Sequence, residues 1–288
     1  SSSHNIGEAI TFIVTAMIVS SFGWQWGFRG AALLGLLGFV IIAVFMRDTP
    51  QSCGLPPVDV YSGDVTLEAG KDSDKLSVAD YQRQVLRNPA IWMLALGSAF
   101  MYISRYAVNS WGIFFLEAGK GYSTVEAGSV ISVSSVCGII GTVVSGWVSD
   151  RFFGGRRNLP ALIFGLMNVL SLGLFLFGPA GNLWLDVASM IVFGLAIGAL
   201  ICYLGGLMAV DIASKKASGA ALGVVGIASY IGAALQDLVS GIIIGSGKTA
   251  EAGAASAYDF TTVSWFWIGS AVLSVLCVLT VWNARAKD

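Results

Sequence analysis

Eight stretches of the chain are each long and apolar enough to cross a lipid bilayer as a helix, which needs about 20 mostly apolar residues. Short polar turns separate most of them, so neighbouring helices are expected to run antiparallel. The sequence therefore predicts an all-α polytopic membrane protein with eight transmembrane helices. The predicted spans are residues 5–22, 28–46, 90–116, 125–148, 159–178, 183–210, 219–245 and 261–282.

The composition agrees with this class of protein. Charged residues make up 11% of the 288 residues and apolar residues 56%, whereas about 25% of an average soluble domain is charged. So few charges cannot coat a soluble globule of this size, which argues against a soluble enzyme. The net charge of −1 provides no basic field for nucleic acid. The four cysteines are isolated and the histidine is single, so we expect neither a metal site nor a cofactor.

One connection differs from the short turns. Residues 47–88 form a long hydrophilic linker, rich in charges and prolines, in which 76–86 has a weak helical pattern typical of a helix lying on the membrane surface. The linker divides the chain into residues 1–46 with two helices and residues 89–288 with six. Six helices behind a long loop are typical of half of a twelve-helix transporter. We therefore interpret 1–46 as the last two helices of a first half whose first four helices are absent.

The basic residues predict the orientation in the membrane, because loops rich in Lys and Arg stay in the cytoplasm. Three basic residues, Arg29, Lys120 and Lys248, lie in the loops on one side of the membrane. Twelve lie on the other side, in the linker, two further loops and the tail. The N-terminus of the chain, the linker and the C-terminus are therefore predicted to be cytoplasmic. The twelve residues are Arg47, Lys71, Lys75, Arg83, Arg87, Arg151, Arg156, Arg157, Lys215, Lys216, Arg285 and Lys287.

Arg105 is the remaining basic residue, and it lies inside the predicted span 90–116, too deep to reach either headgroup layer comfortably. A charge at the centre of a membrane helix costs about 2.5–3.5 kcal/mol and tends to mark function. A planar guanidinium in a low-dielectric cavity suits the oxygens of phosphate or carboxylate. Tyr102 and Asn109 fall one turn away on the same face. The alternative is a structural arginine paired with a carboxylate such as Asp237.

Three other ionisable residues lie within or at the start of predicted spans. His4 and Glu8 are four residues apart, so their side chains can meet on one helix face, where the carboxylate would orient the imidazole. An interhelical hydrogen bond without a substrate role is the alternative. Asp237 is a candidate counter-charge for Arg105, a proton-linked group or a carboxylate near a helix end. Tyr230 lies seven residues earlier and shares roughly the face of Asp237.

Small residues four positions apart permit two helices to approach closely in a membrane. The chain has three such spacings that we single out, a pattern that is common in transporters and has little specificity. They are Gly141-x-x-x-Ser145, Gly194-x-x-x-Gly198 and Gly219-x-x-x-Gly223.

The turn that follows the span 125–148 is more specific. Residues 146–157 read GWVSDRFFGGRR, which resembles the cytoplasmic loop motif G-x-x-x-D-R-x-G-R-R of the major facilitator superfamily with one residue inserted. In that superfamily the loop forms charged contacts that latch one half of the protein to the other. The resemblance implies the same role for Gly146, Asp150, Arg151, Arg156 and Arg157.

A narrower resemblance covers essentially the whole chain. Residues 47–57 read RDTPQSCGLPP, which resembles the start of the central loop in the organophosphate:phosphate antiporter family. Residues 3–7 (SHNIG) are similar to a segment of the family's helix 5, and Tyr102-x-x-Arg105-Tyr106 to its arginine-bearing helix 7. The strings KKASG at 215–219 and YIG at 230–232 also fall where the family has similar residues.

This resemblance implies a substrate phosphate held between two arginines, of which Arg105 is one and the other belongs to the family's helix 1, outside this chain. It also implies that His4 assists phosphate binding and that Tyr102 and Tyr230 line the site. Two positions depart from the family. Glu8 stands where the better-known transporters usually have glycine, and the tyrosine expected near position 199 of helix 10 is absent, with Tyr203 one turn away.

The resemblance therefore predicts a secondary transporter in a bacterial inner membrane, with no enzymatic step. It would exchange a phosphorylated metabolite, glycerol-3-phosphate or hexose-6-phosphate, for inorganic phosphate by alternating access. The first alternative is a membrane sensor of external sugar phosphate that signals to a histidine kinase partner. The second is a proton-coupled drug or sugar carrier that uses Glu8 or Asp237 as its proton carrier.

Overall fold

The computed structural model describes residues 7, 14, 17–18, 21–47, 50–56, 61, 78–214, 217–249, 257–282 and 284. Within these residues, seven helical segments are long and apolar enough to cross a membrane. They match seven of the eight predicted spans, and the predicted span 5–22 falls largely outside the described residues. The segments are α2 (Trp24–Phe45), α6 with the π-helical turn η2 (Pro89–Phe114, Phe115–Gly119), α7 (Thr124–Phe153), α8 (Asn158–Phe177), α9 with the π-helical turn η3 and α10 (Leu183–Cys202, Tyr203–Leu207, Met208–Ile212), α11 (Ser218–Ser246) and α12 (Thr261–Thr280).

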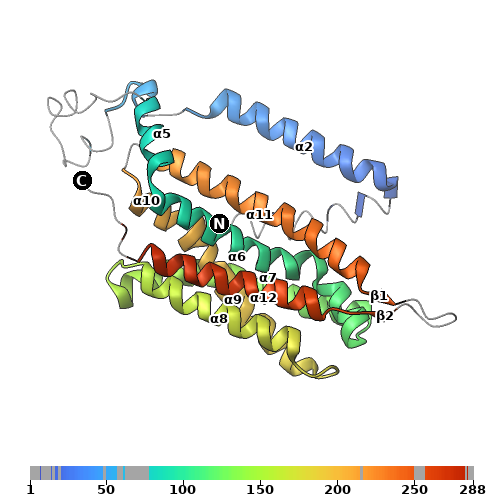
Figure 1. The fold of residues 1–288 in the computed structure, drawn as a ribbon. Coiled ribbons are helices and arrows are strands. Elements are labelled where there is room, and N and C mark those ends of the chain that lie inside the picture. Colours follow the sequence, from blue (N-terminus) through green and yellow to red (C-terminus); the bar gives the residue numbers. More distant parts are fainter. Residues whose placement is uncertain are drawn as a thin grey trace. The chain divides into compact units, whose positions relative to one another are not determined.

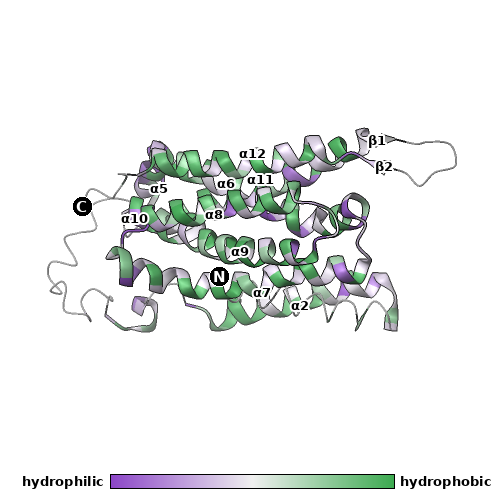
Figure 2. Cartoon of the chain, turned by 90° about the horizontal axis from the view of Figure 1, so that it is seen from below, coloured by the Kyte–Doolittle hydropathy of each residue, from purple (hydrophilic) through white to green (hydrophobic). Residues whose placement is uncertain are grey.

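The internal contacts divide the chain into two compact units. The described residues from 7 to 80 belong to one unit, and those from 81 onward belong to the other. The first unit contains α2 and the 3₁₀ turn η1 (Pro50–Cys53), and α2 buries none of its side chains. Helices that stay apolar on every exposed face belong in lipid. Figure 2 shows apolar residues along the lengths of the membrane helices.

The six membrane helices of the larger unit follow a short helix, α5 (Val78–Arg87), which confirms the helical pattern predicted at 76–86. Asn88 then caps α6, because its side chain accepts a hydrogen bond of 3.0 Å from the backbone N–H of Ala90. Pro89 occupies the first helical position, where its missing N–H leaves no bond unmade. The entry into α6 is therefore encoded locally, by two neighbouring residues.

The six helices form two repeats of three. Helix α7 packs against α9, and α6 packs against α11 and α12, while α8 contacts both α9 and α12 (Figure 1). This pattern is unchanged when α6, α7 and α8 are exchanged with α9, α11 and α12. Three antiparallel helices end on the side of the membrane opposite to the one on which they began. The second repeat is therefore inverted relative to the first. Inverted repeats of this kind recur in secondary transporters.

Two of the three small-residue spacings lie at the contact between α7 and α9, where the backbones approach closely. A Cβ added to Gly141 would lie 2.2 Å from the carbonyl oxygen of Leu195, and one added to Gly198 would lie 2.1 Å from that of Gly138. The third spacing makes no close approach within the six-helix unit. Gly219 and Gly223 are exposed and have no atom within 4 Å of an added Cβ, because their face of α11 points away from the neighbouring helices.

The described residues contain one short antiparallel ladder. Its strands are β1 (Lys248–Thr249) and β2 (Ala257–Tyr258), between α11 and α12. We call this end of the six-helix unit, which also holds the α6–α7 and α8–α9 connections, the hairpin end. The opposite end, where α5 enters α6, is the linker end.

Candidate functional site

Arg105 lies inside α6 and is buried, with 4% of its surface exposed. Its guanidinium carbon lies 5.7 Å from the ring centroid of Tyr102 and 5.5 Å from that of Tyr106. The two rings stack on each other with centroids 6.0 Å apart, because residues at i and i+4 of a helix are neighbours on its surface. The electron-rich ring faces thus stabilise the buried cation from one side.

Tyr230 reaches this cluster from α11, where its ring meets that of Tyr102 edge-on with the centroids 5.7 Å apart. Two contacts hold α6 and α11 close enough for this. The hydroxyl oxygens of Ser98 and Ser229 are 2.7 Å apart and share a buried hydrogen bond. One turn on, a Cβ added to Gly232 would lie 2.6 Å from the carbonyl oxygen of Ala99, so only glycine fits there.

We call Tyr102, Arg105, Tyr106 and Tyr230 the arginine–tyrosine cluster. Tyr230 is 55% exposed, so the cluster runs from the interior of the six-helix unit to its surface. The half-buried Asn109 lies one turn beyond Arg105 on α6. A cation that is desolvated by protein and flanked by phenol groups is suited to bind an anion.

Helix α8 supports the other side of α6. The Asn168 side-chain amide donates a hydrogen bond of 3.2 Å to the hydroxyl of Ser104, which itself donates to the carbonyl of Met101 at 2.8 Å. Both Ser104 and Asn168 are buried. Since Ser104 directly precedes Arg105, these bonds fix the backbone that carries the guanidinium.

Asp237 was predicted as a charge partner, and the structure places it on the exposed surface of α11. The ion pairs of Lys120 with Asp186 and of Arg157 with Asp211 do not include Asp237. The described residues also contain no group of three His, Cys, Asp or Glu side chains that could hold a metal ion. His4, Glu8, Lys215 and Lys216 lie outside the described residues.

The predicted latch motif lies at the linker end, where α7 stops at Gly154, whose φ of +57° is accessible to glycine without strain. Arg157 pairs with Asp211 of α10 and donates a hydrogen bond of 3.1 Å to the carbonyl of Leu207. This arginine therefore ties the α7–α8 turn to α10 within the six-helix unit. Of the other motif residues, Gly146 is half-buried, and Asp150, Arg151 and Arg156 are exposed.

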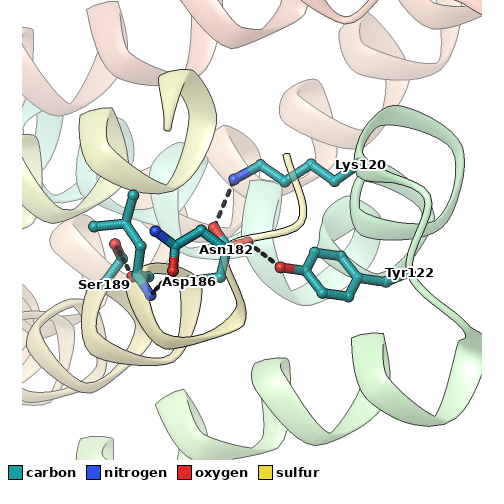
Figure 3. A network of polar contacts seen from close by, with 6 residues as sticks. Lys120, Tyr122, Asn182, Asp186 and Ser189 are labelled. Atoms are coloured by element: carbon teal, nitrogen blue, oxygen red, sulfur yellow. Dashed lines mark hydrogen bonds and ion pairs between the residues drawn. The ribbon is translucent and has the colours of Figure 1, made fainter. Parts of the chain in front are cut away.

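The sequence reasoning missed a polar network at the hairpin end. Lys120 Nζ lies 2.5 Å from Asp186 Oδ1, and the Tyr122 hydroxyl donates a hydrogen bond of 2.9 Å to Asp186 Oδ2 (Figure 3). Burial and the neighbouring carboxylate raise the pKa of Tyr122 to about 12, so the phenol stays protonated and remains a donor. The available signal was Asp186 itself, an acidic residue inside the predicted span 183–210.

Two tyrosines also differ from their expected roles. Tyr106 was not among the predicted site residues. The available signal was its spacing, because it lies four residues after Tyr102 and therefore next to it on the surface of the helix. Tyr203, one turn from the family's helix 10 tyrosine position, is fully buried, and its hydroxyl donates a hydrogen bond of 2.5 Å to the carbonyl of Ser145. Tyr203 therefore joins α9 to α7 and is not part of the cluster.

Known proteins resemble the chain over nearly its full length. It is 31% identical over 288 residues to the glycerol-3-phosphate transporter of Bacillus subtilis. This alignment covers 99% of this chain and 62% of the transporter. It is 32% identical over 236 residues to the membrane sensor protein UhpC of Salmonella typhimurium, covering 81% of this chain and 53% of the sensor. It is 29% identical over 287 residues to the hexose-6-phosphate:phosphate antiporter of Escherichia coli, covering 91% of this chain and 58% of the antiporter.

These relatives confirm the resemblance to the organophosphate:phosphate antiporter family that the sequence motifs indicate. The chain spans 53–62% of the length of these three proteins. A family profile, the Major Facilitator Superfamily, matches residues 1–237, which include α2 and all of α6 to α10. Together with the seven apolar helices and the inverted three-helix repeats, this match means that the chain is a multi-pass membrane protein and belongs to the Major Facilitator Superfamily.

Proposed function

We propose that the protein exchanges a phosphorylated metabolite, of the size of glycerol-3-phosphate or a hexose-6-phosphate, for inorganic phosphate across a bacterial inner membrane. The observation that carries this proposal is the arginine–tyrosine cluster, a buried guanidinium held by tyrosine rings from two helices. The names of the relatives point to the same class of substrate.

The chemistry of the cluster favours a phosphate group over a neutral ligand. A guanidinium presents N–H donors in a planar fork that matches two phosphate oxygens, and it stays charged at any physiological pH. Its attraction to an anion is stronger in a low-dielectric interior than in water. The hydroxyls of Tyr102 and Tyr230 and the amide of Asn109 are neutral donors suited to the remaining oxygens.

Exchange follows if a second arginine, from a helix that precedes this chain, faces Arg105 across the site. Two cations in an empty site repel each other and oppose the change of access from one side of the membrane to the other. A bound phosphate dianion removes that repulsion, so the loaded protein changes state readily. We further propose that residues 1–46 and 89–288 belong to the two halves that move, joined by the linker 47–88, with the linker and both ends of the chain in the cytoplasm. The latch motif (Gly146, Asp150, Arg151, Arg156 and Arg157) would then hold the halves together at that side.

The test uses the full-length protein in vesicles loaded with labelled phosphate. We expect labelled phosphate to leave when glycerol-3-phosphate or glucose-6-phosphate is added outside, and to stay when the outside medium contains neither an ester nor phosphate. Efflux that needs no external phosphate compound contradicts exchange. The absence of both efflux and binding contradicts the phosphate site altogether.

The role of Arg105 is tested by Arg105→Lys, which keeps the charge and removes the fork. Loss of one charge-assisted hydrogen bond, about 1.5–3 kcal/mol, weakens phosphate binding by about tenfold to a hundredfold. Arg83→Lys is the matched control, because Arg83 is exposed on α5 and lies outside both the cluster and the latch motif. Binding by Arg105→Lys equal to that of Arg83→Lys would remove Arg105 from the site.

A second candidate is a membrane sensor that binds a sugar phosphate and passes the signal to a histidine kinase. It is favoured by the similarity to UhpC, whose identity of 32% is close to that of the Bacillus transporter. In the vesicle experiment the sensor binds the ester and releases no phosphate. Binding without efflux therefore selects the sensor, and coupled efflux selects the transporter.

A further inference from the structure

The hairpin end holds a buried ion pair that the proposed transport site does not use. The side chain of Lys120 is 4% exposed and that of Asp186 is fully buried. Lys120 follows η2 at the end of the α6 segment, and Asp186 lies in the first turn of α9. Tyr122, from the turn before α7, donates to the second carboxylate oxygen. Three helix ends, the end of the α6 segment and the starts of α7 and α9, thus meet at one carboxylate.

The ammonium group is desolvated on its other sides by aromatic rings. Lys120 Nζ lies 5.8 Å from the ring centroid of Phe115 and 5.3 Å from that of Phe175. Asp186 is favoured where it stands, because the first turn of a helix carries positive partial charge. A charge pair removed from water in this way is held in one geometry, since separating the two groups would leave both charges buried and uncompensated.

This geometry matters for Arg105 because the two basic residues belong to one continuous helical segment, Pro89–Gly119 with Lys120 at its end. The π-helical turn η2 lies between Arg105 and Lys120. The extra residue of a π-helical turn changes the rotation of the helix, and such turns are frequent at functional sites. Helix α6 packs chiefly on α11 and α12. Lys120 is therefore the charged link between the end of the site-bearing helix and α9.

We propose that Lys120, Tyr122 and Asp186 form a charged anchor that sets the depth and rotation of α6, and that Lys120 is a positioning residue for the Arg105 guanidinium. The anchor does not touch the ligand. It acts by holding the end of α6 against α9, so that Arg105 and Tyr102 face Tyr230 on α11. This inference rests on the proposed function, in which Arg105 binds the phosphate group.

The main test is the double variant Lys120→Met with Asp186→Leu in the full-length protein. Exchanging a buried ion pair for apolar residues of similar size is often neutral for folding or stabilising, so we expect a melting temperature close to that of the unchanged protein. The affinity for inorganic phosphate should nevertheless fall by about tenfold, as expected when one charge-assisted hydrogen bond to the anion is misaligned. Unchanged affinity in a stable double variant overturns the proposal.

Tyr122→Phe is the second variant, and it keeps both charges while removing one hydrogen bond. We expect a smaller fall in phosphate affinity, about threefold, and native affinity in this variant contradicts the anchor even if the double variant does not fold. The control is Tyr203→Phe, which also removes a single tyrosine hydrogen bond, here the one to the carbonyl of Ser145 on α7. Its phosphate affinity should equal that of the unchanged protein, and a loss in this control equal to that of Tyr122→Phe would overturn the proposal.

A ligand-free measurement separates this inference from the proposed function. The double variant Ser98→Cys with Ser229→Cys should form a disulfide rapidly under mild oxidation, because the two native hydroxyl oxygens are 2.7 Å apart. In the Lys120→Met, Asp186→Leu background this reaction should slow several-fold, because α6 has lost its fixed position. Unchanged cross-linking overturns the positioning role, whereas slower cross-linking in a protein that binds no phosphate would support the anchor and contradict only the proposed ligand.

Discussion

Replacing Gly198 with alanine should weaken the contact between α7 and α9. The new Cβ would lie 2.1 Å from the carbonyl oxygen of Gly138 and 3.0 Å from the backbone nitrogen of Thr142, and neither backbone can rotate away. The two helices must therefore separate locally. Overpacking of this kind costs about 1–3 kcal/mol, and the 3.2 Å hydrogen bond from the Thr142 hydroxyl to the Gly198 carbonyl lengthens, which adds about 0.5–1.5 kcal/mol.

The total of roughly 2–4 kcal/mol corresponds to a fall of about 5–15 °C in Tm for a protein of this size. Thermal denaturation of the purified full-length protein in detergent measures it. Gly223→Ala is the matched control, since this glycine stands in the same kind of spacing yet has no atom within 4 Å of an added Cβ. Its melting temperature should stay level or rise, because alanine favours a helix by up to about 1 kcal/mol over glycine. Equal melting temperatures for the two variants would refute the packing argument.

Three further predictions concern single hydrogen bonds. Asn88→Ala removes the cap of α6 and should cost about 1 kcal/mol in thermal denaturation. Tyr203→Phe should cost about 0.5–1.5 kcal/mol by the same assay, through the lost bond to Ser145. Tyr122→Phe loses the bond to Asp186. In the native protein the folded-state pKa of Tyr122 is about 12, above the ordinary tyrosine value of about 10. The raised pKa means that this stabilisation is complete below about pH 10 and disappears as the pH rises towards 12, so melting temperatures of the native and Tyr122→Phe proteins should converge in that range.

The membrane spans could be predicted because hydropathy is a local property of about 20 residues. Their ends were less well predicted where a helix continues beyond the bilayer. Helix α7 extends to Phe153, five residues past the predicted end at 148, because Asp150 and Arg151 are tolerated in a helix that has left the apolar layer. The helix stops where Gly154 and Gly155 adopt positive φ, which is a signal that the sequence does contain.

The candidate site was predictable as far as it lies within one helix. Tyr102 and Arg105 are three residues apart, so their neighbourhood follows from helical geometry. The approach of Tyr230 depends on how α11 packs against α6, and that depends on Ala99 and Gly232 fitting backbone to backbone. Spacing alone does not reveal such a fit, since Gly219-x-x-x-Gly223 has the same pattern and faces away from the bundle.

The ion pair at the hairpin end marks the limit of reading the sequence alone. Lys120 and Asp186 are 66 positions apart, one in a turn and the other in an apolar helix, and each taken by itself has an ordinary explanation. Lys120 counts as a loop cation and Asp186 as an acidic residue that suits the start of a helix. Only the arrangement of three helix ends brings them together and excludes water from both.

The two helix pairs of the larger unit separate stability from binding. The α7–α9 pair is joined along its length by backbone contacts at Gly141 and Gly198 and by the bond from Tyr203, and it contributes no member of the arginine–tyrosine cluster. All four cluster residues lie on α6 and α11. Gly198→Ala should therefore lower the melting temperature with little change in phosphate affinity, and Arg105→Lys should do the reverse. If both variants changed both quantities together, the six helices would respond as one cooperative unit, and the division into a packing pair and a binding pair would fail.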